Sequence, residues 1–345
     1  MMMNIYRYII LTIFCSLCLS CGEPFDMKLE DEPVIYLEAY PGLDEMVELS
    51  VRPAYSMSNS AVRPEFKPEI RFTVNGQEMP VILNKDHCMG NEYASENYLV
   101  DYKPVPGDKM TIEVSSEGFR SVYAETCIPE PFPERKIDYK EIEIGEDKYK
   151  VLYVTFDDEE HTDIAYGVSL LTETATHDSV LQKDTTYYRW SGGYQIRQDW
   201  DISPSSMDGM RILFKKYDKD SYDRYVELAG WDDDSFNGKQ KSLSMALYND
   251  PFEDSSERPV FDENNEQIGV YKSFSRCRLQ LYTFSEEFYK FAVAQELMND
   301  NADFFAGLAP SNFCYTNVVN GYGVFAGVWH VETDWITREF IENNR

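Results

Sequence analysis

The sequence predicts a mostly β protein, with an immunoglobulin-like β-sandwich followed by a larger β-rich domain that has one helix near its C-terminal end. Three observations predict this class. Short runs of alternating apolar residues are separated by turn residues, and a proline-rich stretch interrupts the chain near residue 130. One segment after Ser285 has the apolar spacing of a helix.

The first domain is expected over residues 34–129, where short strands alternate with tight turns. Asn75-Gly76 is the strongest short hairpin signal, and Pro106-Gly107 and Glu117-Gly118 turn the chain again. A string of short strands with few helical runs is typical of an immunoglobulin-like sandwich. The predicted strands cover residues 34–39, 46–52, 70–74, 80–83, 98–102, 110–114 and 121–127.

The second domain is expected over residues 130–345. Pro129, Pro131 and Pro133 break any regular element, so the domain boundary is placed there. Alternating apolar residues beyond this boundary predict further strands. These strands cover residues 148–156, 165–171, 243–247 and 278–283, and closing strands are expected between residues 318 and 335.

One segment of the second domain predicts a helix. Ser285 is a good N-cap, and Glu286 and Glu287 place negative charge in the first turn, where the helix dipole favours it. The spacing of the next apolar residues places Phe288, Phe291 and Ala292 on one face. We therefore expect this helix to pack on a sheet.

Composition excludes some classes of protein. The chain has 32 Lys and Arg against 61 Asp and Glu, a formal net charge of −29, so nucleic-acid binding is not expected. At 43% hydrophobic and 14% aromatic residues, the chain is too apolar for a disordered acidic tail. It can bury a substantial core, and its length suggests about two domains.

The N-terminus predicts a lipoprotein signal peptide over residues 1–20. Residues 8–19 form an apolar run that is too short to span a bilayer and fits the centre of a secretory signal. The run ends at Leu17-Cys18-Leu19-Ser20-Cys21, which resembles the bacterial lipobox, although Cys18 stands where Leu is usual. The resemblance implies that Cys21 is diacylated and anchors the chain to a membrane. The alternative is an ordinary signal peptide cut before an unmodified Cys.

Residues 21–33 predict an acidic linker after the lipidated Cys. The stretch has little hydrophobic periodicity and several carboxylates, which favours a solvated tether. It also resembles the acidic segment that follows the lipidated Cys in surface-exposed lipoproteins of the Bacteroidota. This resemblance implies an outer-membrane location with display on the cell surface.

The cysteines of the body predict disulfides. These residues are Cys88, Cys127, Cys277 and Cys314. An oxidising envelope permits three pairings, and Cys88 with Cys127 and Cys277 with Cys314 keep each bond within one domain. Buried free thiols are the alternative. None of these four cysteines belongs to a Cys-x-x-Cys spacing, so a zinc site is not expected.

Motifs for catalysis and metal binding are weak. The four histidines, His87, His161, His177 and His330, form no recognisable ligand pair, and no Gly-x-Ser-x-Gly elbow is present. Acidic residues gather at 218–223 and 232–234, but neither run matches an EF-hand loop. We therefore expect no metal, no cofactor and no enzymatic activity.

An aromatic segment is the best candidate for ligand binding. It contains Tyr187, Tyr188, Trp190, Tyr194 and Trp200 around a Gly pair. Tyr and Trp rings have a flat apolar face and a polar edge, which suits a sugar ring or a peptide surface. The alternative is a core hairpin with alternating inward rings.

Three stretches resemble a known family. They are residues 106–109 leading into 124–129, residues 236–239, and Thr316-Asn317-Val318-Val319-Asn320-Gly321-Tyr322-Gly323-Val324-Phe325-Ala326-Gly327. Together with the lipobox and the proline-bracketed junction, they resemble the Bacteroidota outer-membrane lipoprotein family called domain of unknown function 4249. The family has no established activity. The resemblance implies a role beside a TonB-dependent outer-membrane receptor.

The predicted function is therefore that of a non-enzymatic surface lipoprotein, accessory to a TonB-dependent transporter in nutrient capture. A structural or adhesive surface protein that binds glycans or glycoproteins is the alternative, and a hydrolase with a dispersed site is the third hypothesis. Function has to be argued from a site, since a fold does not imply one.

Overall fold

The computed structural model describes residues 32–55, 63–84, 96–144, 147–158, 164–191, 196–197, 211–217, 225–232, 238–247, 257–300, 315–337 and 339. These residues form twenty strands in four sheets and a single helix, α3, in the C-terminal part of the chain. The predicted mostly β class, with one helix near the C-terminal end, is confirmed.

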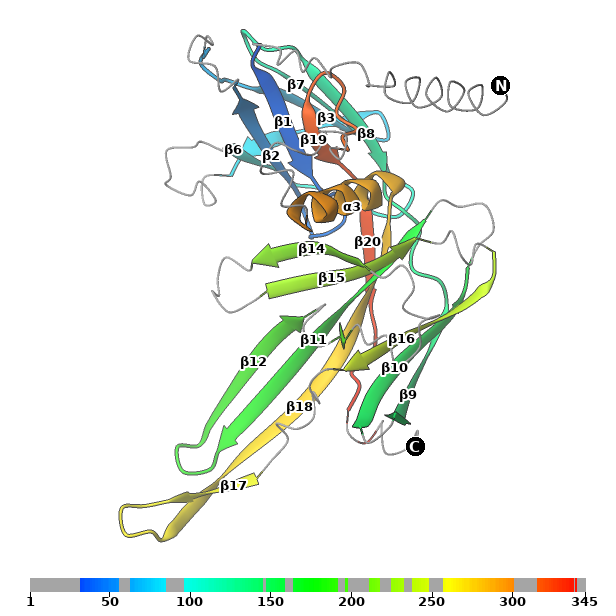
Figure 1. Ribbon diagram of the computed structural model, residues 1–345. Helices are drawn as coiled ribbons and strands as arrows, with labels where there is room; N and C mark the ends of the chain where they lie inside the picture. The colour runs from blue at the N-terminus through cyan, green and yellow to red at the C-terminus, as the bar shows by residue number, and fades with distance from the viewer. Residues whose placement is uncertain are drawn as a thin grey trace, which may run out of the picture.

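Two sheets face each other in the first domain (Figure 1). One sheet contains, in order, β1 (Val34–Ala39), β2 (Val47–Ala54), β6 (Glu96–Val100) and β5 (Val81–Leu83). The other contains β4 (Gln77–Met79), β3 (Glu69–Val74), β7 (Lys109–Ser115) and β8 (Val122–Cys127). This strand order is that of an immunoglobulin-like sandwich. Leu37, Phe72 and Ile112 are fully buried between the sheets.

The turn predicted at Asn75-Gly76 connects β3 to β4. Its two residues have φ angles of 51° and 80°, as a type I′ hairpin requires. The side chain of Asn75 also fixes the turn to the next strand, because it donates to Asp108 Oδ1 at 2.8 Å and accepts from the Lys109 N–H at 3.0 Å. The hairpin signal is therefore local, and the contacts with Asp108 and Lys109 join the turn to β7.

A strand from the far end of the chain completes the first domain. β19 (Tyr322–Phe325) lies parallel to β1, with Tyr322 opposite Tyr36. Phe325 is fully buried and meets the ring of Phe72 edge-on, with centroids 5.9 Å apart. The expectation that residues 130–345 all belong to the second domain is corrected here. Parallel pairing joins segments that are distant in sequence, so no local pattern reveals it.

Small residues explain how closely this C-terminal segment docks. Gly323 has a φ of 108°, and a Cβ there would lie 1.9 Å from the carbonyl oxygen of Leu37. A Cβ at Gly327 would lie 2.2 Å from the carbonyl oxygen of Cys127. The Asn317 side chain accepts from the Phe325 N–H at 3.0 Å and donates to its carbonyl at 2.7 Å. The motif at residues 316–327 is therefore a structural connection to the first domain.

Two further sheets enclose the core of the second domain. The smaller contains, in order, β13 (Ile196–Arg197), β16 (Gln240–Leu247), β10 (Asp147–Asp157) and β9 (Arg135–Ile144). The larger contains β14 (Arg211–Tyr217), β15 (Tyr225–Asp232), β11 (Ala165–Asp178), β18 (Gln267–Phe284) and β17 (Glu257–Phe261), with β12 (Lys183–Ser191) beside β11 and β20 (Val328–Glu332) beside β18. Val154, Val168 and Leu281 are fully buried in their common core.

Helix α3 (Glu286–Asp300) begins where the sequence predicts and joins the two domains. The Phe288 N–H donates to the capping Ser285 Oγ at 3.4 Å. Phe288 and Phe291 are buried on one face, as expected, in a cluster that also contains Tyr40, Leu43, Phe284 and Val324. Tyr40 and Leu43 come from the first domain and Phe284 from β18, so the domains share an apolar core beneath this helix.

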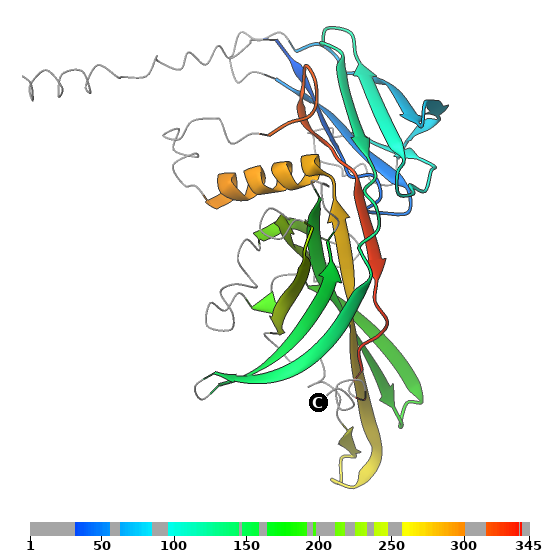
Figure 2. The ribbon, with the colours of Figure 1, turned by 90° about the vertical axis from the view of Figure 1, so that its right-hand side faces the viewer.

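The start of β1 and the tips of two long hairpins lie at opposite ends of an elongated molecule (Figures 1 and 2). The hairpins are β11–β12 and β17–β18. Ser179 connects them, because its N–H donates to the Val270 carbonyl at 3.1 Å and its Oγ accepts from the Val270 N–H at 2.7 Å. The two hairpins are therefore hydrogen-bonded to each other near their tips, at one end of the second domain.

Candidate functional site

Alternate side chains of β18 form a polar cluster on the outer face of the larger sheet. Leu279 and Leu281 are buried in the core, so the period of two places Arg276, Arg278 and Gln280 on the opposite face. We define the arginine–tryptophan cluster as Glu173, Arg276, Arg278, Glu332 and Trp335. Its two adjacent cations are notable in a chain with a net charge of −29.

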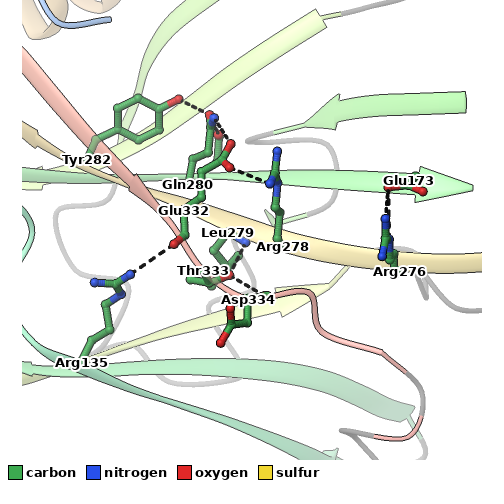
Figure 3. Close-up of polar contacts among 11 residues, drawn as sticks. Arg135, Glu173, Arg276, Arg278, Leu279, Gln280, Tyr282, Glu332, Thr333 and Asp334 are labelled. Atoms are coloured by element: carbon green, nitrogen blue, oxygen red, sulfur yellow. Dashed lines mark hydrogen bonds and ion pairs between the residues drawn. The ribbon is translucent and has the colours of Figure 1, made fainter.

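Each arginine pairs with a carboxylate from a neighbouring strand (Figure 3). Arg276 donates through Nε and Nη2 to Oε2 of Glu173, at 3.1 and 2.7 Å. Arg278 Nη1 lies 2.6 Å from Oε2 of Glu332. The Glu173 side chain is only 10% exposed. Removal of Arg276 would therefore leave a buried carboxylate without its partner, which costs more than breaking a surface ion pair.

Trp335 stacks against both arginines. The guanidinium carbons of Arg276 and Arg278 lie 4.1 and 4.7 Å from its ring centre, within the range of cation–π interactions. Backbone hydrogen bonds hold this part of the chain beside β18. Ile336 exchanges two of them with Cys277, at 2.7 and 3.1 Å. The ring of Trp335 therefore has a fixed position over β18.

A chain of hydrogen bonds runs from Glu332 to Tyr282 (Figure 3). Glu332 Oε1 accepts from Gln280 Nε2 at 3.0 Å, and Gln280 Oε1 accepts from the Tyr282 hydroxyl at 2.5 Å. Burial raises the pKa of Tyr282 well above its usual value, so its hydroxyl remains a donor at neutral pH. The carboxylate of Glu332 is thus oriented from both sides, by Gln280 and by Arg278.

The arginine–tryptophan cluster has the chemistry of a binding surface. Guanidinium and carboxylate groups supply planar donors and acceptors beside an aromatic ring. Nε of Arg278 is buried without a hydrogen-bond partner. Both carboxylates are engaged by arginines, and the five side chains include no hydroxyl, thiol or imidazole nucleophile. The cluster therefore offers planar polar groups and an aromatic face to a ligand.

Of the predicted aromatic residues, only those in β12 lie in the described part of the chain, and β12 pairs with the strand that contains Glu173. Tyr187, Tyr188 and Trp190 belong to β12, and the strand register places Tyr188 opposite Glu173. Glu173 is in turn opposite Arg276 on the other side. Tyr194 and Trp200 lie outside the described residues. Their role in ligand binding, and that of the three residues in β12, stays a prediction.

Sequence reasoning missed the arginines and Trp335 as site residues. The signal that could have found the arginines is the alternation in Arg276-Cys277-Arg278-Leu279-Gln280-Leu281, where polar residues occupy every second position of an apolar strand. The position of Trp335 has no such signal, because it depends on how the chain after β20 pairs with β18.

The predicted disulfides remain predictions. Cys127 is exposed at the end of β8, and Cys277 is buried in the core of the second domain. Their proposed partners, Cys88 and Cys314, lie outside the described residues, as does the lipidation candidate Cys21. The structure therefore describes one member of each predicted pair.

Two of the four histidines and one residue of the acidic runs lie in the described part of the chain. His177 Nδ1 lies 2.6 Å from Asp184 Oδ1 in an exposed pair, and His330 is partly buried beside Tyr282. Asp232 accepts from the Tyr289 hydroxyl at 3.1 Å, while the other predicted acidic residues of both runs lie outside the described ranges. Among the residues that the structure describes, no group of His, Cys, Asp or Glu is arranged to hold a metal ion.

The fold and this cluster define a two-domain, mostly β protein whose C-terminal segment joins both domains. Within the described part of the chain, no helix has both the length and the apolar character needed to cross a bilayer. Residues 22–333 match the family described as Domain of unknown function (DUF4249), and because this match covers most of the chain, the protein belongs to that family. A search of curated proteins found no match.

Proposed function

We propose that this protein is a non-enzymatic lipoprotein, anchored to the outer membrane through Cys21 and displayed on the cell surface, where it assists a TonB-dependent transporter in nutrient capture. The observation that supports it best is a group of exposed apolar side chains at the tip of the paired hairpins. This tip lies at the opposite end of the molecule from β1, which follows the anchor in the chain (Figure 2).

The hairpin tip exposes large apolar side chains. We define it as Val180, Leu181, Phe261 and Ile268, whose exposed fractions are 41, 71, 51 and 51%. Soluble proteins scatter such residues singly, whereas a cluster of them marks a surface for binding another protein or a membrane. The hairpin tip is the surface that contacts the transporter in this proposed function.

Local hydrogen bonds make the hairpin tip rigid before it meets a partner. Asp178 Oδ1 accepts from the backbone N–H groups of Val180 and Leu181, at 2.8 and 3.0 Å. In the other hairpin, Asp262 Oδ1 accepts from the N–H groups of Asn264 and Glu266, both at 2.9 Å. A preorganised surface loses little conformational entropy on binding, which favours affinity.

The direct test is gentle affinity purification of the lipidated protein from its native membrane, followed by mass spectrometry. We expect a TonB-dependent receptor in stoichiometric amount. The double variant Leu181→Asp with Ile268→Asp should lose this receptor, because a charge buried in an apolar interface is costly. Ile82→Asp is the matched control, since Ile82 is 56% exposed in the first domain. Recovery of the protein alone would refute the proposal.

The anchor is tested separately. Replacing Cys21 with Ala removes the acylated side chain, so the variant should leave the membrane fraction and appear in the soluble fraction. Retention of Cys21→Ala in the membrane would show that another part of the chain holds it there.

The second candidate function is adhesion through glycans or glycoproteins, and the arginine–tryptophan cluster favours it. Its aromatic ring can stack on a sugar ring, and its planar polar groups can hydrogen-bond to the hydroxyl groups of a glycan. If adhesion is the function, Trp335→Ala should reduce binding to host or neighbouring-cell glycoprotein while the purified protein carries no transporter. Ile82→Ala, which truncates a side chain that is 56% exposed in the first domain, is the control.

A further inference from the structure

A second polar–aromatic surface lies on the first domain, away from the hairpin tip and the arginine–tryptophan cluster. In β1, Ile35 and Leu37 are fully buried, so Tyr36 and Glu38 stand on the outer face. Helix α3 covers the part of this face that includes Tyr40 and Val324. In the neighbouring part, Tyr36 and Glu38 are half-buried, whereas Arg52 and Tyr322 are exposed. We define the tyrosine–arginine platform as Tyr36, Glu38, Ser50, Arg52 and Tyr322.

The sheet register brings the platform together from both ends of the chain. Tyr36 of β1 lies between Tyr322 of β19 and Arg52 of β2, in one row across three strands. Glu38 lies opposite Ser50 in the next outward-facing row. Neighbouring strands are about 4.8 Å apart, so side chains of one row are in contact range. The platform therefore exists only when the C-terminal strand is docked.

The contacts within the platform fix its polar groups. The guanidinium carbon of Arg52 lies 4.1 Å from the ring centre of Tyr36. The Tyr36 hydroxyl donates to Glu38 Oε2 at 2.9 Å, and the Tyr40 hydroxyl donates to Glu38 Oε1 at 3.1 Å. Burial and the nearby Glu38 raise the pKa of Tyr36 to about 12, so its hydroxyl remains protonated and Glu38 keeps both donors.

Tyr322 differs from its surroundings because it is open to solvent. Its side chain is 54% exposed, whereas Gly323, Val324 and Phe325 after it are buried. Tyr322 shares one row with Tyr36 and Arg52, and Glu38 lies in the next row. These groups are the ones that a sugar ring uses: a flat apolar face for stacking, with acceptors and donors around it for hydroxyl groups.

We propose that the tyrosine–arginine platform binds a neutral oligosaccharide, with a sugar ring on Tyr322 and its hydroxyl groups on Arg52, Glu38 and Ser50. A neutral ligand is favoured because the platform contains one carboxylate, Glu38, and one guanidinium, Arg52, and the net charge of −29 repels anionic polymers. The inference stands apart from the transporter proposal, since it uses no residue of the hairpin tip.

The test is affinity electrophoresis of the full mature chain in native gels that contain a neutral polysaccharide. The probes are laminarin, xyloglucan and galactomannan, with polygalacturonic acid as the anionic comparison. At least one neutral probe should retard the protein. Tyr322→Ala and Arg52→Ala should each weaken this binding about tenfold, the effect of truncating a side chain at a binding hot spot.

Tyr123→Ala is the matched control, because Tyr123 is 41% exposed on the opposite sheet of the same domain. It should bind like the unaltered protein, and thermal melts should show that all three variants are folded. The proposal is overturned if no neutral probe retards the protein, or if Tyr322→Ala binds as well as Tyr123→Ala. Co-purification of a transporter with Tyr322→Ala tests the proposed function independently.

Discussion

Replacing Phe325 with Ala should destabilise the first domain, although Phe325 lies near the C-terminus. Its ring is fully buried in the sandwich core and meets Phe72 edge-on at 5.9 Å. Truncation of a buried Phe costs about 3–5 kcal/mol, and the lost ring pair accounts for about 1 kcal/mol of this. Since a domain is stable by only about 5–15 kcal/mol, the variant should lose a large share of that stability.

Urea denaturation followed by circular dichroism measures the free energy of unfolding, and hydrogen exchange with mass spectrometry locates the effect. We expect faster exchange in peptides from β1 and β2, because β19 pairs with β1. Val319→Ala is the matched control in the same segment. Val319 is 56% exposed, so its truncation should change stability by less than about 0.5 kcal/mol.

Two results would refute this reasoning. A loss of less than about 1 kcal/mol for Phe325→Ala would mean that the ring is not part of the core. Faster exchange confined to β11 and β18 would mean that the C-terminal segment stabilises the second domain alone.

Three further predictions concern stability. Gly323→Ala should cost about 3 kcal/mol or more in thermal or urea unfolding, since its φ is 108° and its Cβ would meet Leu37, whereas Gly76→Ala, with no atom within 4 Å, should cost about 1 kcal/mol. Glu173→Ala should lower the free energy of unfolding by about 2 kcal/mol, because it leaves Arg276 unpaired. Glu78→Ala breaks the exposed pair with Arg71 and should lower it by less than about 1 kcal/mol. Equal losses for the two variants would contradict this. Burial lowers the pKa of His330, so the unfolded chain takes up the proton first as the pH falls through about 6.5 and stability decreases. His330→Gln should therefore show a smaller decrease in unfolding free energy between about pH 7.5 and 5.5, and an unchanged decrease would count against it.

Local patterns predicted the elements whose causes are local. The turn at Asn75-Gly76 depends on two residues that adopt positive φ, and the start of α3 depends on the capping oxygen of Ser285. Apolar alternation also predicted strands that the structure contains, such as β1 and β7. These signals operate within one turn or one strand, so a single sequence displays them.

The arginine–tryptophan cluster could be predicted only in part. Alternation in β18 places Arg276 and Arg278 on one face, but Glu173 and Glu332 reach them from strands that are far away in sequence. Trp335 joins them because the chain after β20 continues to pair with β18. The tyrosine–arginine platform has the same origin, since Tyr322 reaches Tyr36 through a parallel pairing.

The sequence by itself determined the mostly β class, the single helix with its N-cap, the sandwich of the first domain and the family. Only the tertiary structure decided that β19 completes that sandwich, that α3 joins both domains, and which polar side chains meet on the outer faces. The physical reason is the range of the forces involved. Turns, caps and alternation follow from steric and hydrogen-bonding preferences of neighbouring residues, whereas strand order follows from burying apolar surface that only the assembled chain brings together.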